Sequence, residues 1–165
     1  MNPRSVAHVV ELAGGEIVGR VRLQKITCLL EMAGAQFGFH FDYHLYGPYS
    51  DALSVAVSDA GALGLVNIED RTAQWGGHYS IFRTPDHAEA TKPLARLATL
   101  AAAGGSVELE LAVTAAFLAK AGVANPWAEV ASRKSGKATD ERVQSAKDLY
   151  ARLSAIQTPT PLPRI

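Results

Sequence analysis

Residues 65–83, with the sequence LVNIEDRTAQWGGHYSIFR, decide the fold class that the chain predicts. Residues 65–68 and 79–83 each have the composition of a short β-strand. Between them, Trp75-Gly76-Gly77 is typical of a turn, because glycine adopts the backbone conformations that a reversal needs. The stretch therefore predicts a two-stranded hairpin.

The segments before this hairpin complete a recognisable order. Apolar residues at helical spacing predict helices over about residues 6–13 and 20–33, and a third over 50–63 with Ser50 as its N-cap. The phenylalanines of residues 37–41 alternate with smaller or polar residues, which predicts a strand continuing through residue 46 to Gly47-Pro48. Helix, helix, strand, helix and hairpin is the order of a winged helix.

The second half of the chain is predicted to be helical. Helices are expected from Pro85-Asp86 to about residue 103, then from Ser106, from Asn125-Pro126 and from Thr139. The sequence therefore predicts an α+β, mostly helical protein. It would have a winged-helix-like front half with a β-hairpin wing, a helical back half, one domain over residues 1–157 and a loose Pro-rich C-terminal tail over 158–165.

Composition indicates an ordinary globular chain. Its 165 residues are 48% hydrophobic and 19% charged with zero net charge, which suits one domain with its own core. Apolar stretches are too short to span a bilayer, and no apolar signal core follows Arg4. The single cysteine, Cys28, can form no internal disulfide. We therefore expect a cytoplasmic protein without a membrane partner.

The candidate binding segment is YHLYGPYS at residues 43–50. Glycine permits a close backbone approach, proline restricts the entry to the following helix, and tyrosines are favoured at interfaces. We expect at least one tyrosine to be exposed; in the alternative, the segment is only a rigid structural joint. The candidate partner-binding residues are Tyr43, Tyr46, Gly47, Pro48 and Tyr49.

No set of residues in the sequence is equipped for catalysis or for holding a metal or cofactor. His40 and His44 lie on a predicted strand with no fitting carboxylate or thiol nearby in sequence. Cys28 lies in an apolar run, and Ser135-Gly136-Lys137 lacks the upstream glycine of a phosphate loop. We therefore expect a non-enzymatic protein that uses no cofactor and no metal.

The distribution of charge separates two classes of partner. No lysine or arginine lies between Lys25 and Arg71, a span that contains the predicted third helix with Asp51 and Asp59. A helix that reads DNA needs cations or amides, so this helix disfavours DNA. Later in the chain, Arg133, Lys134 and Lys137 are candidate contacts for phosphate or an acidic protein surface, with a solvated loop as the alternative.

Two patterns carry a family resemblance. LQKI at residues 23–26 followed by YHLYGPYS at 43–50 resembles the YwgA-like bacterial family and the C-terminal domain of DarG-type antitoxins. The chain is more distantly similar to Panacea antitoxin domains, and ELELAVTAAFL at 108–118 resembles a later helix of the family.

The resemblance implies a module that binds and neutralises a toxin or effector. In DarG-type proteins this domain accompanies a macrodomain that removes ADP-ribose, and nothing in this chain resembles a macrodomain. We therefore expect the partner to be another protein. A winged-helix DNA-binding transcriptional regulator is the alternative, and the oligomeric state stays open.

Overall fold

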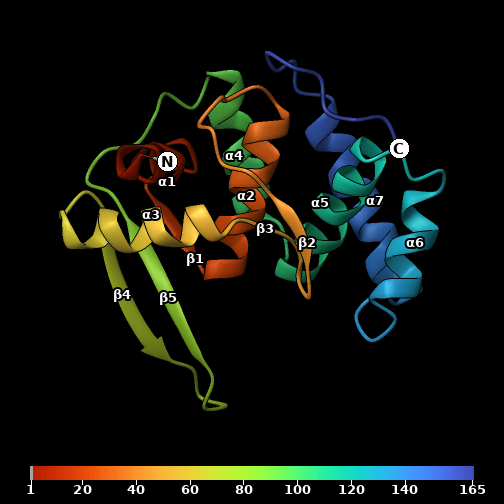
Figure 1. The fold of residues 1–165 in the computed structure, drawn as a ribbon, viewed down its shortest axis with the longest axis horizontal. Coiled ribbons are helices and arrows are strands. Elements are labelled where there is room, and N and C mark those ends of the chain that lie inside the picture. The colour runs from red at the N-terminus through yellow and green to blue at the C-terminus, as the bar shows by residue number, and fades with distance from the viewer. Residues whose placement is uncertain (1) are drawn as a thin grey trace.

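A computed structural model describes residues 2–165 (Figure 1). Helices dominate, and the strands form one three-stranded and one two-stranded antiparallel sheet. The predicted α+β, mostly helical class is confirmed. In chain order the elements are α1 Pro3–Leu12, β1 Glu16–Val18, α2 Arg20–Met32, β2 Asp42–His44, β3 Gly47–Tyr49, α3 Asp51–Ala62, β4 Asn67–Thr72, β5 His78–Arg83, α4 Pro93–Ala103, α5 Ser106–Lys120, α6 Pro126–Arg133 and α7 Asp140–Ser154.

The predicted hairpin is present and projects from the body of the molecule as a wing (Figure 1). Strands β4 and β5 pair from Asn67↔Arg83 to Thr72↔His78, so β4 begins two residues later than predicted and runs further. The turn is closed by a 2.7 Å hydrogen bond from Ala73 N to Gly77 O. The wing is thus a regular antiparallel ribbon.

A third strand of this sheet, β1, was not predicted from the sequence. It pairs with β5, which gives the strand order β1-β5-β4. Its three residues lie between Gly15 and Gly19, which both have positive φ. Three residues are too few to show an alternating pattern, so periodicity in the sequence could not predict this strand or its pairing.

The predicted strand over residues 37–41 is wrong. The backbone there is irregular, and positive φ at Gln36 and Gly38 interrupts any extended run. Phe39 and Phe41 are buried and Phe37 is half-buried, so the alternation of phenylalanines reflects packing against the core. The strands of this region are β2 and β3, which form a small separate hairpin.

The predicted helix from Pro85 to residue 103 begins only at Pro93. A residue before proline is disfavoured in helical conformation, and proline is accommodated at the first helical position, where Pro93 lies. Residues 84–92 instead cross over α1, where Ala88 N donates a 2.9 Å hydrogen bond to Glu11 O. Pro93, and not Pro85, therefore starts this helix.

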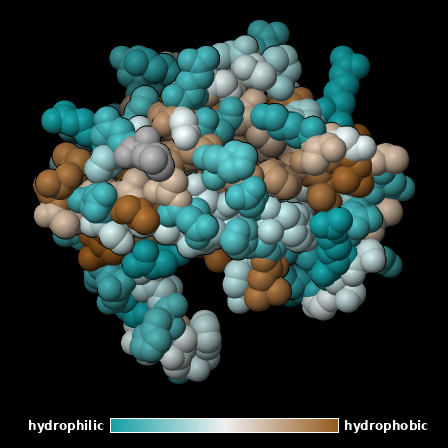
Figure 2. All heavy atoms as spheres, in the orientation of Figure 1, coloured by the Kyte–Doolittle hydropathy of each residue, from teal (hydrophilic) through white to brown (hydrophobic). Residues whose placement is uncertain are grey.

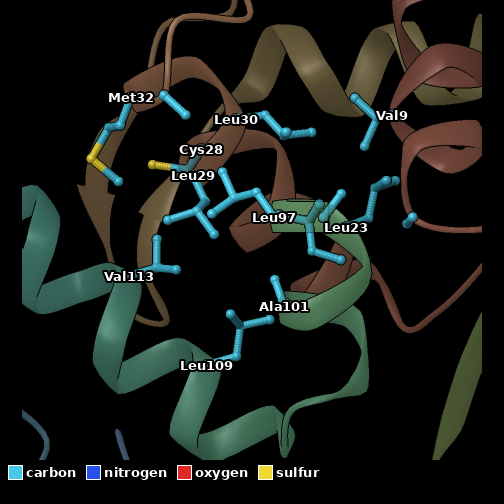
Figure 3. Close-up of a cluster of buried hydrophobic side chains, with 14 of the residues drawn as sticks. Val9, Leu23, Cys28, Leu29, Leu30, Met32, Leu97, Ala101, Leu109 and Val113 are labelled. Atoms are coloured by element: carbon cyan, nitrogen blue, oxygen red, sulfur yellow. The ribbon is translucent and has the colours of Figure 1, made fainter. Parts of the chain in front are cut away.

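The core gathers around α2, whose residues 23–30 are all buried. Figure 3 shows Leu29 from α2 facing Leu97 from α4 and Val113 from α5. Cys28 lies in this cluster, and burial raises the pKa of its thiol to about 12, as fits an inert core residue. A helix buried on all sides is the central support of the molecule.

The C-terminal tail packs against the body instead of being loose. Thr160 N donates to Ala33 O at 2.9 Å, Tyr150 donates its hydroxyl to Pro163 O at 2.5 Å, and Leu162 is buried. The tail is nonhelical, as its prolines predicted. Within residues 2–165, none of the helices has the length and apolar character needed to cross a membrane.

Candidate functional site

The tyrosine-rich segment forms the β2–β3 hairpin. Its strands pair from Asp42↔Tyr49 to His44↔Gly47, so Leu45 and Tyr46 alone make the turn. Gly47 has a φ of +83°, which glycine adopts without the strain that a Cβ would bring. The predicted joint before the third helix is therefore a tight hairpin that leads directly into α3.

Two neighbouring side chains of α2 anchor the returning strand of this hairpin. Gln24 Nε2 donates to Ser50 O at 3.0 Å, and Ser50 N donates to Gln24 Oε1 at 2.9 Å. Lys25 Nζ donates to Pro48 O at 2.7 Å. Ser50 Oγ also accepts from Leu53 N and caps α3, as predicted. These bonds join the two sequence patterns on which the family resemblance rests.

The backbone of the hairpin lies directly against α5. A Cβ at Gly47 would overlap the hydroxyl oxygen of Thr114, and its next close neighbour would be the Lys25 side chain. Thr114 is fully buried, and its hydroxyl has no hydrogen-bond partner within residues 2–165. Close approach and positive φ therefore both require glycine at position 47.

Beneath the hairpin lies a group of charged residues that we call the lysine–glutamate cluster: Lys25, Glu110, Lys134 and Lys137. Glu110 is only 2% exposed, and its carboxylate lies 3.5 Å from Lys134 Nζ and 3.0 Å from Lys137 Nζ. Burial lowers the pKa of Lys25 to about 8 and lowers that of Lys134, while the Glu110 carboxylate opposes both shifts. Two ammonium groups, those of Lys134 and Lys137, thus lie against one buried carboxylate, and Lys25 is a third cation near enough to feel its charge.

The end of α6 and the loop after it meet the hairpin. Lys134 Nζ donates to Leu45 O at 3.2 Å, and Lys137 Nζ lies 4.6 Å from the centre of the Tyr46 ring. The Arg133 guanidinium lies 4.8 Å from the centre of the Tyr43 ring, within the range of cation–π attraction. The structure therefore brings together the tyrosine segment and the basic loop, which the sequence indicated as separate candidates.

The tip of this hairpin is exposed. Leu45 is 82% exposed and Tyr46 is 50% exposed, whereas Tyr43 and Tyr49 are half-buried. Figure 2 shows hydrophobic surface at this tip, on the underside of the body and to the right of the projecting wing. The expectation of at least one exposed tyrosine is confirmed by Tyr46. Gly47 and Pro48, also candidates from the sequence, are buried and position the tip from below.

The three basic candidates differ in their exposure. Lys134 is buried and its ammonium is occupied by Leu45 O and Glu110, which removes it from the candidate surface contacts. Arg133 is exposed and pairs with Glu129 at 2.6 Å, and Lys137 is partly exposed. We call the accessible set the hairpin surface. It consists of Tyr43, Leu45, Tyr46, Arg133 and Lys137.

The histidines near the hairpin do not form a metal centre. His40 Nε2 lies 3.2 Å from Asp42 Oδ1 on the surface, and the His44 ring packs against Tyr49 with centres 5.2 Å apart. Residues 2–165 contain no cluster of three or more histidine, cysteine or acidic side chains arranged to hold a metal ion.

Sequence reasoning missed the buried residues that support the hairpin. Glu110 lies between Leu109 and Leu111, and the residues that follow are apolar through Leu118 apart from Thr114. A helix without a polar face has no side suited to water, so it is expected to be buried in the core. The carboxylate of Glu110 could therefore have been predicted to be buried as well. Lys25 gave the same signal as the cation that precedes the ITCLL run.

Part of the chain is similar to a known protein. The chain is 32% identical over 85 residues to YwgA of Bacillus subtilis (strain 168), which is described as an uncharacterized protein. The match covers 48% of this chain and 51% of YwgA, so the chain spans about half the length of the curated relative it matches. No protein-family model matches the chain. No solved structure matches it either.

Proposed function

We propose that this protein is a non-enzymatic binding module that neutralises a partner protein, in the manner of an antitoxin domain. The hairpin surface would contact the partner and cover its active or nucleic-acid-binding surface. The observation that carries this proposal is a rigid hairpin, anchored by buried hydrogen bonds, that exposes Leu45 and Tyr46 at its tip.

The physical properties of the tip suit protein recognition. A side chain on a fixed backbone loses little entropy when it binds, and tyrosine is enriched among residues that dominate binding energy. Tyr46 offers an apolar ring together with a hydroxyl, and Leu45 adds an aliphatic surface beside it. Arg133 and Lys137 flank the tip and favour acidic groups on the partner.

The family resemblance supports the same reading. The LQKI and YHLYGPYS patterns resemble those of DarG-type antitoxin domains. In this protein the side chains of Gln24 and Lys25 from the first pattern bond to backbone atoms of Pro48 and Ser50 in the second. The likeness to YwgA adds no activity, because that protein is described as uncharacterized. The proposal that the partner is a toxin or effector therefore rests on the hairpin and on the two sequence patterns.

The alternative of a DNA-binding regulator has less physical support. Helix α3 carries the exposed carboxylates Asp51 and Asp59 and no lysine or arginine. In the wing, Arg71 and Arg83 both bond to Glu69, at 2.8 and 2.7 Å. A carboxylate that faces a phosphate backbone opposes binding, and cations already paired in the sheet contribute less to it.

A site-specific photo-crosslinking experiment in the native host tests the proposal. A photoreactive phenylalanine analogue replaces Tyr46 in one strain and Trp75 in another, because both are exposed aromatic residues at a hairpin tip. We expect a discrete protein adduct from position 46 and none of that mass from position 75. Adducts to DNA, or a protein adduct only from position 75, would contradict the proposal.

A further inference from the structure

A second concave site lies away from the hairpin surface, at the start of α2. It is a cavity of about 560 Å³ between the first turn of α2, strand β5 and the start of α5. This volume falls within the range of small-molecule sites. The residues that matter for its chemistry are Gly19, Arg20, Arg22, Asp70, Tyr79 and Ser106.

Two arginines line this cavity. Arg22 is fixed in place, because its guanidinium donates to Ala102 O at 3.1 Å and to Ser106 Oγ at 2.7 Å. Its Nε is buried and has no hydrogen-bond partner within residues 2–165. Arg20 is largely exposed, with its guanidinium 5.6 Å from the centre of the Phe82 ring. A guanidinium held in place like that of Arg22 suits oxyanions, and Arg20 adds a second positive charge at the open side of the cavity.

The backbone beside these arginines adds further donors. Helix α2 has Gly19 as its N-cap and no side chain that caps it. Its first intrahelical bond is from Leu23 N to Gly19 O, and the N–H groups of Arg20, Val21 and Arg22 have no acceptor within residues 2–165. A Cβ at Gly19 would meet open space, so no atom of the protein fills the region beside this N-cap residue.

One carboxylate stands at the rim of the cavity. Asp70 is mostly exposed, its Oδ1 lies 3.9 Å from Arg20, and it accepts a hydrogen bond from Ser80. A long, exposed ion pair of this kind is weak and can be displaced by a ligand anion. The other walls include Tyr79 and the exposed Val18 and Val21, which offer apolar contact to the body of a ligand.

We propose that this cavity binds a small organic phosphate of nucleotide size. The phosphate would lie between Arg20, Arg22 and the free N–H groups of α2, and the organic part would lie against Val21 and Tyr79. This site is separate from the proposed function, since it shares no residue with the hairpin surface.

Calorimetric titration of the full chain with AMP and with inorganic phosphate, at matched ionic strength in chloride, tests this proposal. Three variants accompany the wild type: Arg20→Gln, Asp70→Asn and the control Arg4→Gln, an exposed arginine outside the cavity. We expect AMP to bind more tightly than phosphate, at least tenfold weaker binding for Arg20→Gln, several-fold tighter binding for Asp70→Asn and no change for Arg4→Gln.

Several outcomes would overturn the proposal. Absence of AMP binding to the wild type would remove the site, and an equal loss in Arg4→Gln would reduce it to general charge attraction. Equal affinity for AMP and inorganic phosphate would exclude a role for the organic part. A DNA duplex is titrated in the same way, and its binding through Arg20 without AMP binding would replace the small molecule with nucleic acid.

Discussion

The two hairpins of this protein expose an aromatic residue at their tips but are built in opposite ways. The β2–β3 hairpin is short and lies against α2 and α5, which bond to it through Lys25 and approach it at Gly47. The β4–β5 wing is longer and projects away from the core, with Trp75 84% exposed at its tip (Figure 1). The core therefore supports the tip of the β2–β3 hairpin, whereas only its own two strands support the tip of the wing.

The charges of the two hairpins differ in the same way. Glu110 and Lys134 beneath β2–β3 are buried, so removal of either residue leaves the charge of the other buried, with neither this counter-charge nor water to stabilise it. In the wing, Glu69 pairs with Arg71 and Arg83 on the surface, where water compensates for a lost pair. From this difference in burial we expect similar ion pairs to make very different contributions to stability.

The largest expected effect is that of Glu110→Gln. Without this carboxylate, Lys134 and Lys137 lose their shared counter-charge, and we expect the free energy of unfolding to fall by about 3–5 kcal/mol. Glu69→Gln in the wing is the matched control, and we expect little change because its ion pairs are exposed. Urea unfolding of both variants measures the difference. Similar losses would show that burial of the cluster is not what matters.

The next effect separates close packing from backbone strain. Gly47→Ala introduces a Cβ at positive φ and against Thr114, so we expect a loss of about 2–4 kcal/mol. Gly76→Ala in the wing has a similar φ of +92° but open space, so strain alone predicts about 1–2 kcal/mol. Thermal unfolding compares the two variants. Equal losses would mean that the contact with α5 contributes nothing.

A smaller effect is expected from pH. The pKa of Lys25 is about 8 in the folded protein against an ordinary value of 10.5, so above pH 8 the unfolded chain binds more protons and stability rises with pH. From pH 7.5 to 9 we expect the unfolding free energy of the wild type to gain about 1 kcal/mol relative to Lys25→Met.

Two buried groups act in the opposite direction towards the upper end of this pH range. Burial raises the pKa of Cys28 and of Tyr150 to about 12, which lowers stability as pH approaches and passes their ordinary values of 9.0 and 10.0. Both groups are present in wild type and in Lys25→Met, so the difference between the two proteins reports on Lys25. The measurement is urea unfolding of both proteins at several pH values. Parallel curves for wild type and Lys25→Met would show that Lys25 is not the titrating group.

The sequence predicted the parts of this fold that depend on local pattern. The wing followed from Trp75-Gly76-Gly77 between two strand-like runs, and α3 followed from Ser50 and the apolar stripe behind it. Strand β1 could not be predicted, because its three residues are a strand only through pairing with β5.

The candidate site was predicted in pieces. The tyrosine segment stood out by composition, but its contact with Lys134 and Lys137 joins parts of the chain far apart in sequence, and only tertiary packing sets such a contact. The same packing buries Lys134, which local polarity had indicated as a surface residue. Local patterns thus located the hairpin but not the helices that hold it.

The central claim is that Tyr46 binds a partner on a support that does not depend on it. The direct test is the affinity of Tyr46→Ala for the protein captured through position 46, measured together with its melting temperature and with Trp75→Ala as control. We predict at least about thirtyfold weaker binding, equivalent to about 2 kcal/mol, with the melting temperature unchanged and with wild-type affinity for Trp75→Ala. Unchanged affinity for Tyr46→Ala, or a loss of affinity matched by a comparable loss of stability, would contradict the account.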